Sequence, residues 1–506
     1  MNSLIWTCLL SLLLFCCTTA AQDLSACLGA INSLATVYPQ SNGYDTAKAV
    51  FNLRTVSDPA VVVYPASTAD VQAVVGCARK SGTKAVPRSG GHSYEGLSVL
   101  NSSVVVDLSR NINTVEILDV AGTLARVGAG IRLGPLYYQV YKLTGRGFPA
   151  GTCPTVGAGG HFLGGGWGML ARRNGLAADH VVGIEMVDYK GDVIIANETQ
   201  NTELLWASRG GGGGTFGIVT HFTISLVDVP PRVTIVQIQW PAGSPTADVM
   251  RAWQHWANSD ATNPNLTTEL QMYSSGTGLH GMYSGPQADA EAAVQASGLL
   301  SVGNPGQPTY KEMSYIEAVL YWGHATMGLP DNDVANLLLP PNVVAQMWPP
   351  ESFKAKSYDP EDFLSDAALA VIVNNLAANP TGWIQFSSYG GAVGQLPRSQ
   401  SAYAGRYSKF NMQYYVGWSD ASRAQANLDW INGFQAALAP LVGPTSYVNY
   451  IDLQLPNWQQ AYWGPYLQNL TAVKATFDPQ NFFSNPLTIP PAQTAVAARR
   501  ALRQHA

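Results

Sequence analysis

The chain has 506 residues, of which 46% are hydrophobic and only 12% are charged. Soluble proteins carry roughly 25% charged residues, so neutral polar side chains must cover much of this surface. The net charge of −5 without any basic cluster excludes a nucleic-acid partner, because such affinity needs concentrated Lys and Arg. The length suits two or three domains, or one large domain with insertions.

Residues 1–21 are predicted to form a secretory signal. An apolar run at 4–17 is too short to span a membrane, and small residues suited to cleavage near Ala21 follow it. No later apolar run is long enough to cross a bilayer, so we expect no membrane span and a protein secreted to the medium or the cell wall. The glycosylation sequons agree with a secreted glycoprotein, and they begin at Asn101, Asn197, Asn265 and Asn469.

Removal of that signal leaves Cys27, Cys77 and Cys153, an odd number for an oxidising compartment. Cys27 and Cys77 both lie in helix-like segments and are predicted to form a disulfide. Cys153 is left over, either as a buried inert thiol or as a residue with a role of its own.

The first half of the chain predicts strands and helices separated by glycine turns. Residues 60–93 predict a strand, a helix that begins at Ser67 or Thr68 and ends at Gly82, a second strand and a glycine turn. Residues 103–111 predict a strand, and 124–145 a strand followed by a helix. The many glycines of 148–170 predict neither a regular helix nor a strand. Residues 180–196 predict a hairpin that turns at Lys190 and Gly191, and 202–227 a short helix, a five-glycine loop and a long strand.

After residues 228–232 the glycine loops end. We expect a strand at 233–240, a helix at 248–259, a long Pro- and Asn-rich middle, strands at 383–391, 407–418 and 446–455, and a helix at 421–442. The pattern predicts an α+β fold, with an N-terminal domain at 22–227 and a second domain at 228–460. A C-terminal segment at 461–506 is expected to pack back on the first domain.

Three glycine-rich loops, at 89–91, 157–168 and 210–217, lie next to predicted strands. Glycine lets a backbone approach a ligand closely, and successive N–H groups form anion-binding concavities. Each loop alone is equally well an ordinary tight turn, but three in one domain indicate a large phosphate-bearing cofactor. They lack the strand–GxGxxG–helix setting of a Rossmann fold and the GK[ST] of a P-loop.

The stretches "RSGGHSYEG" and "GTCPTVGAGGHFLGGGWG" together resemble the berberine-bridge-enzyme-like flavoprotein oxidases of the vanillyl-alcohol-oxidase-type superfamily. The resemblance extends from "CLGAI" to "FDPQNFFSNPLTIPP", and its site pattern is most similar to that of the gluco- and chito-oligosaccharide oxidases. It implies a two-part FAD-binding domain and a substrate domain whose antiparallel sheet is covered by helices. It also implies that FAD is attached covalently twice, through His92 and Cys153.

The same resemblance implies that further residues bind FAD: Arg88, Ser89, Gly90, Gly91, Ser93, Val156, Gly157, Gly160, His161, Gly164, Gly168, Gly217 and Ile218. Arg88 to Gly91 would hold the pyrophosphate, with a charge-assisted bond from the guanidinium. His161 is equally suited to a structural role. The small Val156 after "CPT" implies room for O2 at the flavin, and hence an oxidase that makes H2O2. No metal site is predicted.

On the substrate side, the resemblance implies hydride transfer from a substrate carbon to flavin N5, with a base that takes the hydroxyl proton. Tyr450 of "YVNYID" stands at the position of that base, with Tyr447 in the same motif and Tyr94 as a further substrate contact. A phenol with a pKa near 10 is a poor base at neutral pH, so Tyr450 needs neighbours that stabilise its phenolate. Gln413 replaces the catalytic glutamate of the alkaloid-converting relatives, and glutamine is no general base.

Trp167 departs from the tyrosine common in plant relatives, which leaves the substrate contacts open. The expected function is a secreted oxidase that converts the C1 hydroxyl of a mono- or oligosaccharide to a lactone while O2 becomes H2O2. Aromatic residues in "WQHW", "MYSSGTGLHGMYSG" and "YYVGW" would provide sugar stacking, although tryptophan in such segments also suits a core. The alternatives are an oxidase of small aromatic or allylic alcohols or alkaloids, and a non-catalytic flavoprotein. The sequence indicates no oligomeric state.

Overall fold

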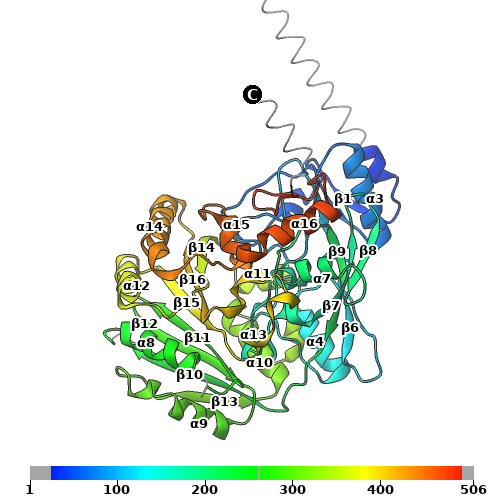
Figure 1. Cartoon of the computed structure of the whole chain (residues 1–506). Coiled ribbons are helices and arrows are strands. Elements are labelled where there is room, and N and C mark those ends of the chain that lie inside the picture. The colour runs from blue at the N-terminus through cyan, green and yellow to red at the C-terminus, as the bar shows by residue number, and fades with distance from the viewer. Residues whose placement is uncertain (1–23, 245, 260–261, 493–506) are drawn as a thin grey trace, which may run out of the picture.

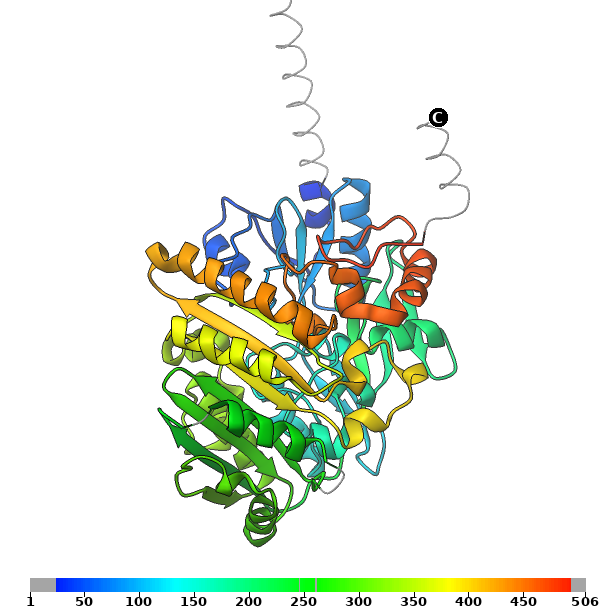
Figure 2. The same ribbon diagram turned by 60° about the vertical axis from the view of Figure 1, so that its left-hand side comes forward.

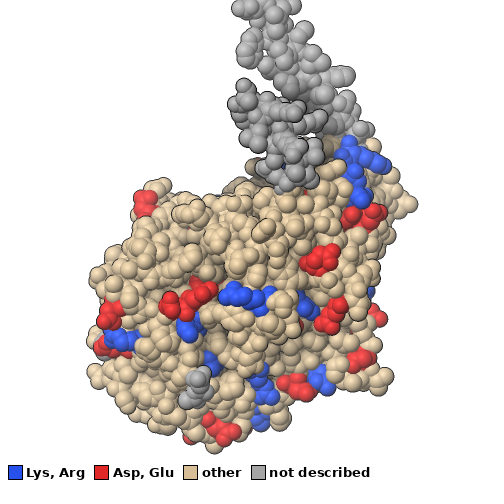
Figure 3. Space-filling model, in the orientation of Figure 1, with Lys and Arg blue, Asp and Glu red and all other residues tan. Residues whose placement is uncertain are grey.

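The computed structural model describes residues 24–244, 246–259 and 262–492 (Figure 1). The signal predicted at 1–21 lies outside these ranges. Within them, no helix has both the length and the apolar character that a membrane crossing requires. Lys, Arg, Asp and Glu are sparse and scattered on the face shown in Figure 3, which has no continuous basic patch.

The N-terminal half begins with a four-stranded sheet in the order β1 (Ala35–Val37), β2 (Val61–Tyr64), β4 (Val104–Asp107) and β3 (Ala85–Arg88). β2, β4 and β3 are parallel, and all four residues of β2 and of β4 are buried, as expected for parallel strands covered on both faces. Helix α3 (Thr68–Lys80) follows β2 and begins at Ser67, whose Oγ accepts a hydrogen bond from the N–H of Asp70.

The predicted disulfide is confirmed. Cys77 of α3 is bonded to Cys27, which lies in a helical segment at 24–29, and the two Cα atoms are 5.7 Å apart. Cys153 is the free cysteine of the described residues.

A five-stranded antiparallel sheet follows, in the order β5 (Val115–Ile117), β6 (Leu124–Gly128), β9 (Ile218–Ser225), β7 (Val181–Val187) and β8 (Val193–Asn197). The hairpin predicted at Lys190 and Gly191 is confirmed, with Gly191 at a φ of 91°. Helices α4 (Leu133–Thr144) and α7 (Thr202–Ser208) also lie where we expected them.

The prediction that 148–170 contains no regular helix is wrong, because α5 spans Ala158–Leu163. Ala158, Phe162 and Leu163 bury one face of this helix in the core, and that packing outweighs the poor helix propensity of its two glycines. Gly159 is needed there, since a Cβ would lie 2.9 Å from the carbonyl oxygen of Ala129.

The second half is built on a seven-stranded antiparallel sheet: β13 (Thr309–Met313), β10 (Val233–Pro241), β12 (Gly276–Tyr283), β11 (Leu266–Tyr273), β15 (Gly382–Ser388), β16 (Phe410–Trp418) and β14 (Ser352–Tyr358). Helices α8 (Thr246–Ala257), α12 (Asp366–Ala378) and α14 (Ala424–Val442) cover one face (Figure 2). Strand residues alternate: Leu270 and Met272 pack against these helices, whereas Glu269, Gln271 and Tyr273 lie on the opposite face. The predicted α+β fold is thereby confirmed.

Three further helices connect and close the two halves. Helix α9 (Gln287–Ala296) packs on β10 and β13, and α10 (Tyr315–Met327) lies between the sheet and α4. Helix α11 (Pro341–Met347) precedes β14. Trp167 and Leu170 share an apolar cluster with Ile235 and Met282, so the uncovered sheet face meets the N-terminal half.

The strand predicted at 446–455 is wrong. Val448–Tyr450 form a 3₁₀ turn, η7, because the neighbouring backbone bonds elsewhere: the N–H of Ser446 donates to Ala461 O, and that of Tyr447 to Ser357 Oγ. Helices α15 (Trp458–Trp463) and α16 (Leu467–Phe477) follow. Leu470 of α16 belongs to the apolar core of the N-terminal half. Helix α16 itself packs beside α7 (Figure 1).

Candidate active site

The loop that carries His92 and the loop that carries Cys153 lie against each other. A Cβ on Gly90 would lie 2.3 Å from the backbone nitrogen of Gly157, and one on Gly157 would lie 2.1 Å from that of Gly90. Both positions therefore require glycine. The ring of His92 completes the contact, since its Nε2 is 2.9 Å from Oγ1 of Thr155, two residues beyond Cys153.

The imidazole of His92 is neutral at physiological pH. Its ring stacks on Phe51, with centroids 4.3 Å apart and planes 18° apart. Burial is the main cause that lowers the pKa of His92 to about 4, and the nearby Arg132 and His161 lower it further. A neutral imidazole keeps a nitrogen lone pair, so His92 is suited to bond an electrophilic carbon.

Cys153 is a partly buried thiol. Burial raises its pKa, the negative charge of Glu269 raises it further, and a hydrogen bond with Thr326 opposes both effects. Because the thiolate is the reactive form of cysteine, the protein alone keeps Cys153 in its less reactive state.

Two segments near these residues are suited to hold phosphate groups. Among the described residues, the backbone N–H groups of 90–93 donate to no protein acceptor, and neither do those of 213–216 in the five-glycine loop. Ser89 Oγ donates to Ala129 O at 2.7 Å, so that side chain fixes the first loop. Successive N–H groups without partners form an anion-binding concavity, which fits a phosphate-bearing cofactor.

The guanidinium of Arg88 is already held by the protein. Its Nε and Nη2 donate to Asp107 Oδ2 at 2.8 and 2.5 Å, and Nη2 also donates to Ala47 O at 2.5 Å. The side chain is buried and fixes the end of β3 from behind the loop. The contacts thus favour backbone N–H groups over Arg88 as donors to the pyrophosphate.

The segment with the YVNY motif fixes the second glycine loop. The N–H of Gly166 donates to the hydroxyl of Tyr447 at 2.9 Å, and Nδ2 of Asn449 donates to the same oxygen at 3.0 Å. A Cβ on Gly164 would lie 2.0 Å from Asn449 Oδ1. Tyr447 is buried, which raises its pKa to about 12, so it holds the loop as a neutral phenol.

His161 has a structural contact of its own. Its Nε2 accepts a hydrogen bond from the N–H of Gly151 at 2.9 Å, and burial lowers its pKa to about 4. It therefore ties α5 to the segment that precedes Cys153.

Of the remaining residues predicted to bind FAD, some are at least partly accessible and others are packed against neighbouring atoms. Val156 and Ser93 are half-buried beside Cys153 and His92, and Gly160 is exposed with no atom within 4 Å of a built Cβ. Gly168 is pressed against Ala150 O, at 1.8 Å from a built Cβ. Gly217 lies against Met186 and Ile218 is fully buried in β9, so these last two act through packing.

Tyr94 and Tyr450 form a stacked pair, with ring centroids 5.3 Å apart and planes 6° apart. Nε2 of Gln413 donates to the hydroxyl of Tyr94 at 2.6 Å. The hydroxyl of Tyr450 has no hydrogen-bond partner among the described residues and its side chain is half-buried, so it is available to a substrate. The ring of Tyr447 meets that of Tyr450 edge-on, with centroids 4.9 Å apart, so the structure brings together all four predicted substrate-side residues.

Burial raises the pKa of both Tyr94 and Tyr450. Tyr94, Tyr447 and Glu269 raise the pKa of Tyr450 still further, so no neighbour among them stabilises its phenolate. Tyr450 is therefore a neutral phenol at neutral pH in the protein alone.

Glu269 is a site residue that we did not predict. It lies on the sheet face that meets the N-terminal half, and its Oε1 accepts a hydrogen bond from Gln385 Nε2 at 2.7 Å. Burial raises its pKa to about 7, and its charge affects both Cys153 and Tyr450. The alternation of "LTTELQMY" places Glu269 opposite Leu270 and Met272, which is the one sequence signal that points to it.

Two family models match the chain: an FAD binding domain over residues 59–197, and the berberine and berberine-like family over 446–490. The uncharacterised FAD-linked oxidoreductase YvdP of Bacillus subtilis is 31% identical over 465 residues, which cover 90% of this chain and 98% of the relative. Berberine bridge enzyme-like 10 of Arabidopsis thaliana is 30% identical, with 91% of both chains covered.

Solved structures agree over 93% of this chain and 100% of their own. Physcomitrella patens BBE-like 1 has a TM-score of 0.86 at 31% identity. A chitooligosaccharide oxidase has a TM-score of 0.83 at 27% identity, and berberine bridge enzyme from Eschscholzia californica has 0.83 at 26%. The TM-score is therefore the same for the chitooligosaccharide oxidase and for berberine bridge enzyme, so similarity of the overall fold does not distinguish between their substrates.

Proposed function

The chain belongs to the berberine-bridge-enzyme-like FAD-linked oxidoreductases, and from that premise we propose that its substrates are sugars with a free reducing end. In the proposed reaction the C1–H bond breaks and its electron pair leaves as hydride. The C1 hydroxyl loses its proton, and the new C1=O makes a lactone. Bound FAD supplies the two-electron acceptor, and O2 takes up the two electrons and two protons as H2O2.

A row of aromatic rings on the sheet face toward the site carries this proposal. Tyr273, Trp383 and Tyr415 are cross-strand neighbours on β11, β15 and β16, with successive centroids 6.2 and 5.1 Å apart. Phe353 stacks on Tyr415 at 4.9 Å, and Tyr94 meets Phe353 edge-on at 5.1 Å. The row begins at the exposed Tyr273 and ends at the Tyr94–Tyr450 pair, as a binding platform for an extended ligand would.

Polar side chains accompany the row on the same face. Gln271, Gln385 and Gln413 lie on β11, β15 and β16, and Glu269 accepts a hydrogen bond from Gln385. Stacking rings beside amide donors and acceptors suit a sugar, which offers apolar C–H faces and hydroxyls at its edges. The three amides already bond neighbours on this face, and the hydrogen-bonding capacity that remains to them suits hydroxyl groups better than it suits a largely apolar polycyclic ligand. Trp253, by contrast, packs in the core behind the sheet, so "WQHW" does not contribute its Trp253 to the row.

In the proposed mechanism, His92 and Cys153 hold the cofactor and the N–H groups of 90–93 receive a phosphate. The free hydroxyl of Tyr450 binds the C1 hydroxyl and, as phenolate, takes its proton. Because Gln413 already donates to the oxygen of Tyr94, the proton of Tyr94 is free to bond a substrate oxygen. The two stacked phenols would then orient one sugar ring between the row and the cofactor.

A peroxide-release screen tests the substrate class. The panel contains cello-, malto-, chito- and xylo-oligosaccharides, lactose, cinnamyl-type alcohols and a benzylisoquinoline alkaloid. We expect H2O2 with reducing sugars and none with their borohydride-reduced alditols, which lack the C1 hemiacetal. Peroxide only with the aromatic alcohols or the alkaloid would overturn the proposal in favour of those substrates, and no peroxide with any compound would favour a non-catalytic flavoprotein.

The proposed double attachment has a separate test. Flavin should stay with the acid-precipitated wild-type protein and with each of the single variants His92→Ala and Cys153→Ala, and it should be released from the double variant. Flavin released from the wild-type protein contradicts covalent attachment altogether. Release from either single variant shows one linkage in place of two.

A further inference from the structure

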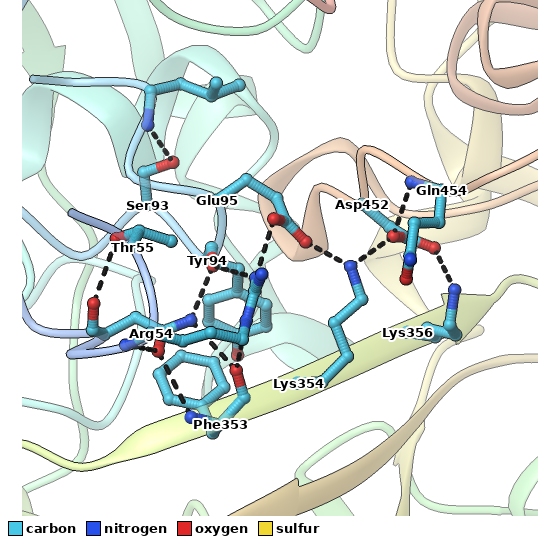
Figure 4. Close-up of polar contacts among 12 residues, drawn as sticks. Arg54, Thr55, Ser93, Tyr94, Glu95, Phe353, Lys354, Lys356, Asp452 and Gln454 are labelled. Carbon is cyan, nitrogen blue, oxygen red and sulfur yellow. Dashed lines mark hydrogen bonds and ion pairs between the residues drawn. The ribbon is translucent and has the colours of Figure 1, made fainter. Parts of the chain in front are cut away.

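A buried network of charged residues joins four segments that are far apart in the sequence (Figure 4). Nζ of Lys354, on β14, donates to a carboxylate oxygen of Glu95 and, at 2.5 Å, to Oδ1 of Asp452. Arg54 Nη2 donates to the other oxygen of Glu95 at 2.6 Å, and Lys356 Nζ to the other oxygen of Asp452 at 2.6 Å. Of the side chains that the structure describes, Lys354 alone bonds both carboxylates.

The carboxylates of this network adjoin the two stacked tyrosines. Glu95 directly follows Tyr94, and Asp452 is two residues beyond Tyr450. Lys354 in turn directly follows Phe353, whose ring packs edge-on against Tyr94. Lys354 therefore links β14, which carries Phe353 against Tyr94, to the chain segments on which Tyr94 and Tyr450 lie.

Hydrogen bonds to the backbone make this connection stiff. Nδ2 of Asn52 donates to the carbonyl oxygen of Tyr94 at 2.7 Å and to that of Phe353 at 3.1 Å. The N–H of Asp452 donates to the hydroxyl of Tyr462 at 2.8 Å. The carbonyl group of Tyr94 and the N–H group of Asp452 are thus both held in place beside the network.

The stability of the fold alone does not account for a buried network of charges at this place. The side chains of Lys354, Glu95 and Asp452 are only 1–2% exposed, so their charges are almost wholly removed from water. Apolar residues of the same volume often stabilise a fold as well as a buried ion pair does, or better. What the bonds add is a fixed geometry, since each carboxylate oxygen has a defined partner.

We propose that Lys354 is a positioning residue for the reaction: acting through Glu95 and Asp452, it sets the separation and tilt of Tyr94 and Tyr450. The proposal rests on the proposed function for the roles of the two tyrosines. Displacement of a reacting group by about 1 Å costs on the order of 100-fold in rate, so a link of this kind has a measurable kinetic consequence.

The main test is the double variant Lys354→Met with Glu95→Gln. It removes one positive and one negative charge, leaves Asp452 paired with Lys356, and leaves Arg54 partly exposed to water. We expect the double variant to fold and to reduce its flavin about 100-fold more slowly than wild type at saturating sugar, under anaerobic stopped-flow conditions. The half-saturating sugar concentration should change far less, because the aromatic row is intact.

The variant Ile372→Ala is the matched control for loss of stability. Ile372 is fully buried in α12, in the apolar core between the helices and the sheet, and its side chain forms no hydrogen bond with the network, so this variant should unfold more easily and reduce its flavin at the wild-type rate. A wild-type reduction rate in the double variant would overturn the proposal. Equal slowing in Ile372→Ala would also overturn it, since general destabilisation would then explain the effect.

Two further measurements extend the test: the first uses a single variant, and the second needs no substrate. Glu95→Gln alone keeps the size of the side chain and weakens its bonds, and should slow flavin reduction about tenfold. A crystal structure of either variant should show the Tyr94 and Tyr450 centroids displaced from their 5.3 Å separation. An unchanged tyrosine pair overturns the proposal, and because this result needs no substrate, it decides the matter even where sugar oxidation itself is refuted.

Discussion

Removal of a single hydroxyl group from Tyr450 tests its assignment as the base. Because that hydroxyl has no hydrogen-bond partner among the described residues, Tyr450→Phe breaks no bond within the described protein. We expect the free energy of unfolding to change by less than about 0.5 kcal/mol, as for other substitutions that break no structural contact. The rate of flavin reduction should fall by roughly 10²–10⁴-fold, the usual contribution of a general base.

Tyr447→Phe is the matched control, because it removes the same group from a neighbouring ring 4.9 Å away. The Tyr447 hydroxyl accepts hydrogen bonds from Gly166 N–H and Asn449 Nδ2, and its loss leaves a buried N–H without a partner. This variant should lose about 1–3 kcal/mol of unfolding free energy. Tyr450→Phe is therefore expected to lose rate and keep its stability, whereas Tyr447→Phe is expected to lose stability.

The assays are anaerobic stopped-flow reduction at saturating sugar and denaturant unfolding of the same preparations. A Tyr450→Phe variant that reduces its flavin at the wild-type rate would refute the assignment of the base. A large loss of stability in that variant would refute the reading of its hydroxyl as free.

Three other predictions follow from the same geometry. Since burial raises the pKa of Tyr450 and the phenolate is the active form, flavin reduction should accelerate as pH rises from 6 to 10, and a rate that falls over this range would contradict the mechanism. Gly90→Ala should lower the covalently bound flavin, measured after acid precipitation, because the added Cβ would lie 2.3 Å from Gly157 N, and full flavin retention would show that the loops can separate freely. In the folded protein, burial raises the pKa of Glu269 from 4.5 to about 7. The carboxyl group therefore ionises more readily in the unfolded state, and the free energy of unfolding falls as pH rises from about 4.5 to 7. Glu269→Gln should therefore raise the unfolding free energy by up to about 3 kcal/mol at pH 8 and leave it nearly unchanged at pH 4, as measured by urea unfolding at both pH values.

Local sequence patterns predicted most of the elements of the fold. Valine-rich runs at 61–64 and 104–107 became buried parallel strands, and Ser67 began its helix, because burial and capping are properties of short segments. The resemblance placed His92 and Cys153 in one site, and the close contact of Gly90 with Gly157 agrees with that placement.

The failures have a common physical origin in tertiary contacts. The segment at 446–455 has a strand-like pattern, but Ala461 O and Ser357 Oγ accept the hydrogen bonds of its first two N–H groups, and the motif does not reveal either acceptor. Pairing of Arg88 with Asp107 could likewise not be predicted from the motif, although the pyrophosphate role of Arg88 stays a prediction. Glu95, Lys354 and Asp452 gave no signal at all, because a network across 259 and 98 residues of sequence has no local pattern.

The position of the C-terminal segment bears on how the protein is made. Tyr447 and Asn449 fix the second glycine loop, and α16 completes the core beneath the third. A nascent chain that still lacks these last elements has an unfinished cofactor domain, although every loop residue of that domain has already left the ribosome. Folding of the cofactor domain therefore depends on the last part of the chain, and chains truncated before residue 446 lack the contacts that fix its second glycine loop.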